Sequence, residues 1–164
     1  LIYTLLDWAN LDDDVGRLVS FMARRQRSHR PKSFMLIPGV RECLEALGPR
    51  YPMAVVSARD QAHSLDFLDY FGLRGMFSCV ATSQTCAHTK PFPDPVLWAA
   101  GQMGVAPHEV LMVGDTTVDI HAGRNAGAQT VGVLCGFGRE AELRRAGADL
   151  ILPSTADLPN ALGG

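Results

Sequence analysis

The sequence predicts an α/β fold in which a parallel sheet is covered by helices on both faces. Short apolar runs alternate along the chain with segments whose apolar residues recur at helical spacing. Strands that alternate with helices in this way are typical of parallel sheets buried between two helical layers. Because ligands of such sheets gather at the carboxyl ends of the strands, polar residues just after strands are the first candidates for a site.

Turn residues and apolar spacing set the expected elements after Pro38 and Gly39. The helix after strand 53–56 is indicated by the spacing of Leu65, Phe67, Leu68 and Phe71, and Gly72 ends it. The apolar run 110–113 predicts a buried strand. In chain order we expect helix 40–47, strand 53–56, helix 65–71, strand 77–81, helix 95–103, strand 110–113, helix 121–126, strand 130–134, helix 139–146, strand 150–152 and a helical turn at 157–162.

The first part of the chain has the apolar spacing of a helix. Apolar residues recur at helical spacing behind an acidic group that suits a helix N-terminus, namely Val15, Leu18, Val19 and Met22 after Asp12, Asp13 and Asp14. The turn at residues 37–39 is the plausible domain boundary. We therefore expect residues 1–37 to form a helical appendage and residues 38–164 to form the α/β core.

Composition limits the classes of partner. The 164 residues are 47% hydrophobic and 20% charged, with a formal net charge of -2, which suits one packed domain plus a small appendage. This charge gives no reason to bind nucleic acid or an anionic membrane, and no apolar run approaches the roughly 20 residues of a membrane span. Four scattered cysteines predict free thiols in a reducing compartment, so a cytoplasmic location is expected; the oligomeric state stays open.

Polar residues that suit phosphate chemistry follow the expected strands or lie in the loops beside them. Ser57 follows the run AVV, Lys90 lies in HTKPFPDP, and Asp115 and Asp119 lie in VGDTTVDI. A lysine can neutralise a phosphate group, and paired carboxylates can hold a hard cation. Together they predict a site of phosphoryl transfer.

The serine loop supplies the expected phosphate-binding groups. The hydroxyl of Ser57 and neighbouring groups of Ala58 and Arg59 can contact phosphate oxygens. Taken alone, Ser57 is more often a helix cap and Lys90 most often a surface charge, and the two aspartates could be a capping pair. Their order and their position after strands favour the functional interpretation.

Other candidates are weaker. No zinc-type spacing joins His63, His88, His108, His121 and Cys86. Asp60 could face the substrate, but an N-terminal helix turn explains it equally well, and the glycine-bearing loop 135–138 is interpreted as a turn.

From Leu36 onward the chain resembles the haloacid dehalogenase (HAD) superfamily, in its phosphoglycolate-phosphatase-like branch. Three of that family's motifs are matched in order, as AVVS ending at Ser57, Lys90 in TKPFPDP, and the GDxxxD pattern of Gly114, Asp115 and Asp119. The resemblance implies a Rossmann-like parallel sheet with a helical cap segment, and it implies Ser57 and Lys90 as catalytic, phosphate-binding residues. It further implies Mg²⁺ as cofactor, with Asp115 and Asp119 as the metal-binding residues.

The family's first motif, a DxDGT-like loop with the nucleophilic aspartate, is not recognisable. Asp7 in LIYTLLDWAN has Ala9 where the second acid belongs, and LDDDVG lacks the preceding strand and the following GT. The stretch 15–30 resembles the later part of the family's cap. We therefore expect the nucleophile and the central strand to lie upstream of Leu1, so that core 38–164 lacks its first strand.

The resemblance implies a Mg²⁺-dependent phosphatase that hydrolyses a small phosphorylated metabolite through an aspartyl-phosphate. A phosphonate hydrolase and a sugar-phosphate mutase stay open within the superfamily, whereas a dehalogenase would not need the acidic pair. From other classes, a noncatalytic phosphate-binding or interaction protein is the alternative, and a receiver-like signalling domain fits the motif order poorly.

Overall fold

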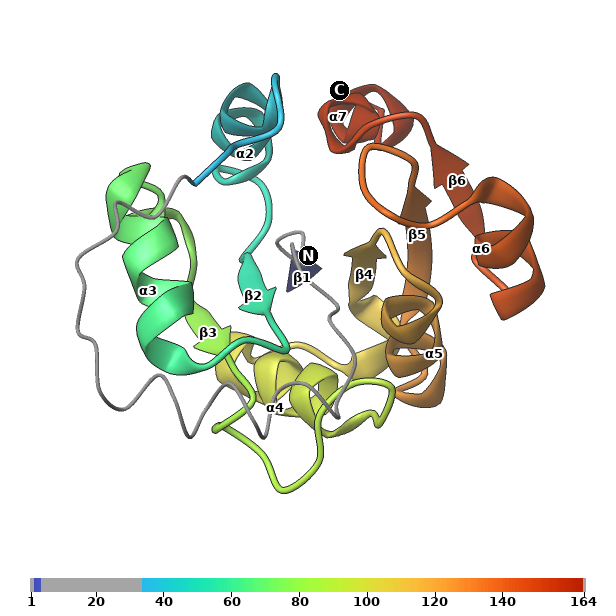
Figure 1. The fold of residues 1–164 in the computed structure, drawn as a ribbon, viewed down its shortest axis with the longest axis horizontal. Helices are drawn as coiled ribbons and strands as arrows, with labels where there is room; N and C mark the ends of the chain where they lie inside the picture. Colours follow the sequence, from blue (N-terminus) through green and yellow to red (C-terminus); the bar gives the residue numbers. More distant parts are fainter. Residues whose placement is uncertain (1, 4–33, 164) are drawn as a thin grey trace, which may run out of the picture.

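The computed structural model describes residues 2–3 and 34–163, and its centre is a six-stranded sheet in the order β3-β2-β1-β4-β5-β6 (Figure 1). All neighbouring strands run parallel. The strands are β1 (Ile2–Tyr3), β2 (Ala54–Val56), β3 (Cys79–Ala81), β4 (Leu111–Gly114), β5 (Gln129–Val133) and β6 (Leu150–Leu152). The predicted Rossmann-like α/β class is confirmed.

The centre of the sheet is occupied by β1, which corrects the expectation that the core lacks its first strand. Ile2 pairs with Ala54 of β2 on one side and with Met112 of β4 on the other. Without it, β2 and β4 would each leave a row of backbone groups unpaired inside the protein. Ile2–Tyr3 therefore belongs to the sheet and not to an appendage. The expected helical cap at 4–33 and the aspartates Asp7, Asp12 and Asp14 lie outside the described residues, so the cap and the boundary near residue 37 stay predictions.

Helices cover both faces of the sheet. The first face carries α2 (Val40–Leu47), α3 (Gln61–Tyr70) and α7 (Leu158–Ala161), whereas α4 (Asp94–Met103), α5 (Thr117–Asn125) and α6 (Glu140–Ala146) pack on the other. Short 3₁₀ turns lie at Arg74–Met76, Pro107–Glu109 and Thr155–Asp157. Figure 1 shows α2 and α7 on one side of the sheet and α4 and α5 on the opposite side.

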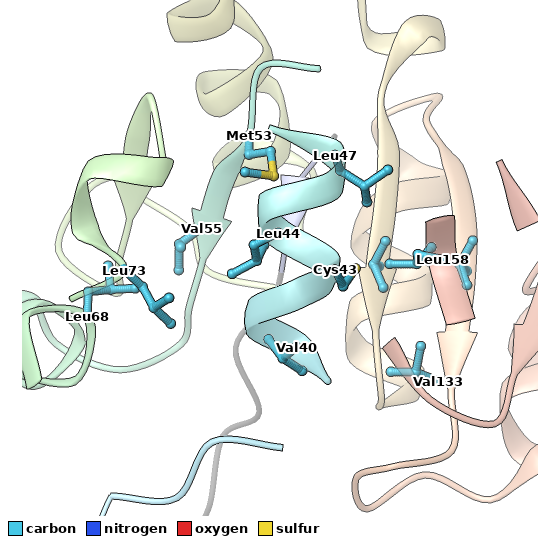
Figure 2. Close-up of a cluster of buried hydrophobic side chains, with 12 residues drawn as sticks. Val40, Cys43, Leu44, Leu47, Met53, Val55, Leu68, Leu73, Val133 and Leu158 are labelled. Atoms are coloured by element: carbon cyan, nitrogen blue, oxygen red, sulfur yellow. The ribbon is translucent and has the colours of Figure 1, made fainter. Parts of the chain in front are cut away.

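The strand residues alternate between two apolar cores. Val55 points into the core under α2, where Leu44 and Leu47 are fully buried (Figure 2). Val113 of β4 belongs to the same core. Ala54, Val56 and Met112 lie in the second core, with α4 and α5. Successive side chains of a strand point to opposite faces, so a sheet buried on both sides needs apolar residues at every position.

Two helices begin earlier than the apolar spacing predicted, because polar side chains cap them. Asp60 accepts a hydrogen bond from His63 N at 2.8 Å and starts α3 at Gln61. Thr116 caps α5, which starts at Thr117 and not near residue 121. Helix α2 and strand β6 match their predicted bounds. The earlier start of α5 puts Asp119 on the first turn of a helix, which matters for the site.

Within the described part of the chain, none of the helices has the length and apolar character needed to cross a bilayer.

Leu44→Ala tests the core under α2. Leu44 is 0% exposed, so its truncation should leave a cavity and lower the free energy of unfolding by about 2–5 kcal/mol. The matched control is Leu97→Ala on α4, where the leucine is 42% exposed and the expected loss is about 0.5 kcal/mol. Urea denaturation of both variants measures the difference, and equal losses would contradict this packing.

Candidate active site

The two strands beside β1 deliver the predicted polar residues to one edge of the sheet. Ser57 follows β2 and Asp115 follows β4, and the central strand lies between them (Figure 1). The sheet order reverses its direction of growth at β1, which is where ligands of open α/β sheets bind. The fold thus brings together residues that are far apart in sequence.

Lys90 reaches this edge from the loop between β3 and α4. Its Nζ donates a hydrogen bond to Asp119 Oδ1 at 2.6 Å and another to Val56 O at 3.1 Å. The two side chains of the ion pair are only 4% and 3% exposed. Removing one partner of a buried pair leaves an uncompensated charge, which costs about 3–5 kcal/mol. The ammonium is therefore fixed beside the end of β2, one residue before Ser57.

Asp119 is held from its other side by the start of α5. Its Oδ2 accepts hydrogen bonds from Thr116 Oγ1 at 2.7 Å and Thr116 N at 3.1 Å. Gly114 permits this approach, because a Cβ at Gly114 would lie 2.6 Å from Asp119 Cγ. Both carboxylate oxygens of Asp119 are thus engaged by protein groups. This favours Asp119 as the anchor of Lys90 over Asp119 as a direct metal ligand.

Among the described residues, the carboxylate of Asp115 has fewer hydrogen-bond donors around it than that of Asp119. Asp115 is 1% exposed, and its Oδ2 accepts a hydrogen bond from Phe137 N at 2.9 Å. Burial raises the pKa of Asp115, and the negative charge of Asp119 adds to this, while the Phe137 N–H and the Lys90 ammonium oppose it. A buried carboxylate with a raised pKa gains most from a cation placed beside it.

The donor set fits a hard divalent cation. Carboxylate oxygens are the ligands that Mg²⁺ prefers, and Mg²⁺ keeps several waters and binds through one or two carboxylates. No group of three or more His, Cys, Asp or Glu side chains suited to a metal occurs within the part of the chain that is described. Asp115 would therefore hold the ion with water, with a phosphate group or with residues outside the described part.

The loop after β2 engages two of its backbone N–H groups within the protein. Ser57 N donates to Ala81 O at 2.8 Å, and Arg59 N donates to Ser57 Oγ at 3.1 Å. The hydroxyl of Ser57, the N–H of Ala58 and the side chain of Arg59 therefore stay the predicted phosphate-binding groups of this loop.

The remaining polar candidates form surface pairs away from this cluster or cap a helix. Asp60 caps α3 and pairs with His63 on the surface, as its helix-cap interpretation predicted. His88 pairs with Asp94 on the exposed side of the Lys90 loop, which lowers the pKa of Asp94. The four cysteines are unpaired, and burial raises the pKa of Cys43 to about 11.

Sequence reasoning missed two supporting residues. Phe137 lies in the loop interpreted as a plain turn, but its backbone N–H contacts Asp115. Asn125 donates from Nδ2 to Pro91 O at 3.1 Å and so ties the end of α5 to the Lys90 loop. Nearly every residue type carries a backbone N–H, so the role of the Phe137 N–H could be found only from the fold. The polar Asn125 at the end of an apolar-faced helix was a visible but weak signal.

Asp115→Asn should stabilise the metal-free protein at neutral pH. Below the ordinary aspartate pKa of about 3.9, folded and unfolded chains are both protonated at this position and the carboxylate has no effect. As the pH rises through the raised pKa of the folded state, the unfolded chain releases its proton first and folding weakens. The amide oxygen of the variant can still accept from Phe137 N–H.

Urea denaturation in the presence of a chelator, at pH 7 and at about pH 3, measures this effect. The variant should have the larger free energy of unfolding at pH 7, and the difference should vanish at the lower pH. A difference of the same size at both values would contradict a raised pKa for Asp115.

Comparison with known proteins places this site in a family. The model of the family described as "Haloacid dehalogenase-like hydrolase" matches residues 7–133. The phosphoglycolate phosphatase of Haemophilus influenzae (strain Rd) is 31% identical over 168 residues, covering 96% of this chain and 74% of that protein. The phosphoglycolate phosphatase of Escherichia coli K12 is 33% identical over 129 residues, covering 78% of this chain and 51% of that protein.

Solved structures share the overall fold. A crystal structure of a predicted phosphoglycolate phosphatase from Haemophilus somnus has a TM-score of 0.74 at 29% identity, covering 93% of this chain and 68% of that one. A β-phosphoglucomutase from Clostridium difficile has a TM-score of 0.65 at 26% identity, covering 75% of this chain and 52% of that one. The match over most of the chain, together with the motif residues gathered beside β1, shows that this protein belongs to the haloacid dehalogenase-like hydrolase family.

Proposed function

We propose that this protein is a Mg²⁺-dependent phosphatase that hydrolyses a small phosphate monoester. The observation that carries the proposal is the buried Lys90–Asp119 ion pair, which holds an ammonium next to Ser57 at the end of β2. Asp115 stands near this pair as a buried carboxylate suited to a cation. The relatives named phosphoglycolate phosphatase support the same chemistry.

Lys90 and Ser57 would bind the phosphate group and stabilise the charge that develops on its oxygens. Phosphoryl transfer depends mainly on positioning and electrostatic stabilisation, since the protein has little covalent chemistry to perform. The two hydrogen bonds of Lys90 Nζ fix its position before substrate arrives. The Ser57 hydroxyl and the Ala58 N–H supply further donors at the same end of β2.

Asp115 would hold Mg²⁺ directly, and Asp119 would hold Lys90. When bound, the cation supplies neutralisation of the negative charge on the phosphate oxygens. Thr116 keeps Asp119 turned toward Lys90, because both its N–H and its hydroxyl contact Asp119 Oδ2. This division assigns the metal-binding role first to Asp115 and a supporting role to Asp119.

The proposed route runs through an aspartyl-phosphate that water then hydrolyses, which splits one difficult step into two. Asp7, which follows the central strand Ile2–Tyr3 in the sequence, is the aspartate of this chain that could act as the nucleophile. Asp7→Asn should then abolish phosphate release, and release that survives this change would exclude Asp7 as the nucleophile.

The substrate class is a small phosphorylated metabolite. Phosphoglycolate is the first compound to test, because the curated relatives are named for it. The similarity to a β-phosphoglucomutase adds hexose phosphates to the panel. A mutase would convert a hexose phosphate into its isomer without net phosphate release, so measuring both products separates the two reactions.

Asp115→Ala and Lys90→Ala should each lower kcat/KM for phosphate release by about 10²-fold or more, because each removes a charge that stabilises the transition state. The assay measures phosphate release from a panel of monoesters by the full-length protein, with and without a chelator. Glu45→Ala, an exposed carboxylate on α2, is the matched control and should retain the parent rate. A folded parent that binds Mg²⁺ and phosphate without turnover would instead favour a noncatalytic phosphate-binding protein.

Ser57→Ala should lower kcat by about 10-fold or more through loss of one hydrogen bond to the developing charge, whereas Ser57→Thr keeps the hydroxyl and most of the activity. Both variants are compared on the substrate that the panel selects. Equal activity of parent and Ser57→Ala would remove the hydroxyl from the proposed phosphate site.

A further inference from the structure

We propose that the loop at residues 135–138, which joins β5 to α6, positions the metal-binding carboxylate of Asp115 through its backbone. The inference rests on the proposed role of Asp115 in holding Mg²⁺. Phe137 and Gly138 are the positioning residues, and neither acts through a reactive side chain.

The first observation is the hydrogen bond from Phe137 N to Asp115 Oδ2 at 2.9 Å. Asp115 is almost fully buried, whereas Phe137 is 56% exposed. The ring of Phe137 is therefore not part of the buried core. What the protein uses from this residue is its N–H, which points inward and favours the charged form of the carboxylate.

The second observation is the close packing of Gly138 on the same residue. A Cβ at Gly138 would collide with the backbone carbonyl oxygen of Asp115 and lie 3.1 Å from its carbonyl carbon. The side chain of Leu143 closes the other side, at 3.2 Å. Consecutive loop residues thus contact both the carboxylate and the main chain of Asp115, so that the loop fixes where this carboxylate lies.

The loop itself is anchored at both ends. Before it, Leu134 N donates to Leu152 O at 3.0 Å, and Cys135 Sγ lies 3.6 Å from Thr155 Oγ1. After it, α6 begins with Arg139 N donating to Glu142 Oε2, and Leu143 is fully buried. An amide carried on a loop that is tied to β6 and α6 has a defined position and can orient the carboxylate that it contacts.

A hydrogen bond to Oδ2 restrains the rotation of the Asp115 carboxyl group and so prepares the group for a cation. Groups that orient metal ligands change metal affinity by about 10–100-fold when they are removed. The same change should result from loss of the Phe137 N–H, while the exposed ring of Phe137 should matter little.

The experiment compares Phe137→Pro, which removes the N–H, with Phe137→Ala, which removes the ring and keeps the N–H. Calorimetric titration of Mg²⁺ into the full-length protein gives the dissociation constant, and thermal unfolding in a chelator reports the fold. We expect Phe137→Pro to bind Mg²⁺ about 10–100-fold more weakly and Phe137→Ala to stay within about threefold of the parent. Phe137→Pro within threefold of the parent, or Phe137→Ala as weak as Phe137→Pro, would overturn the positioning role.

NMR of the ¹⁵N-labelled parent covers the case in which Phe137→Pro does not fold. The Phe137 amide resonance should shift when Mg²⁺ is added and should lose its protection from exchange in Asp115→Ala. An amide that stays unshifted at saturating Mg²⁺ would overturn the inference. If the parent binds no Mg²⁺ at all, both the proposed metal role of Asp115 and the inference are contradicted. If the parent binds Mg²⁺ and Phe137→Pro binds it equally well, only the inference is contradicted.

Discussion

A buried ammonium and a buried carboxylate face each other beside the carboxyl end of β2, and the surrounding backbone is arranged to keep them paired. Because Lys90 and Asp119 are paired, neither is an isolated charge in the protein interior, which would be unfavourable in free energy. This pairing requires a helix start at Thr117, whose cap Thr116 also fixes Asp119, and a glycine at 114, where any side chain would occupy the place of Asp119. The proposed position of the Lys90 ammonium beside a phosphate group depends on this single contact.

Asp115 presents the opposite situation, because its burial is compensated less completely. Its pKa is raised by burial and by Asp119, and the Phe137 N–H and Lys90 only oppose this effect. A buried carboxylate whose charged form is unfavourable in the metal-free state binds a cation more tightly, because the cation offsets this unfavourable free energy. The stability that the protein loses at Asp115 and the cation binding proposed there have the same electrostatic origin.

Much of the architecture could be predicted because it depends on local patterns. Helix α2 and strand β6 appear at their predicted bounds, and the order of Ser57, Lys90 and the acidic pair indicated the chemistry. The two errors have different origins: one is a local helix cap that apolar spacing does not register, and the other is a strand whose partners are distant in the sequence. The start of α5 shifted to the cap at Thr116, and the central strand position expected to lie upstream is filled by Ile2–Tyr3, whose two flanking strands are far away in sequence.

The sequence by itself determined the alternation of elements and the identity of the charged groups, because apolar periodicity and residue chemistry are local properties of the chain. Only the tertiary structure decided which charges pair. It turned Asp119 toward Lys90, since the carboxyl ends of β2 and β4 come to the same end of the sheet, on either side of β1, only when the sheet is assembled. It also recruited the amide of Phe137, because a backbone N–H is the same in every residue except proline and acquires a role only from its position.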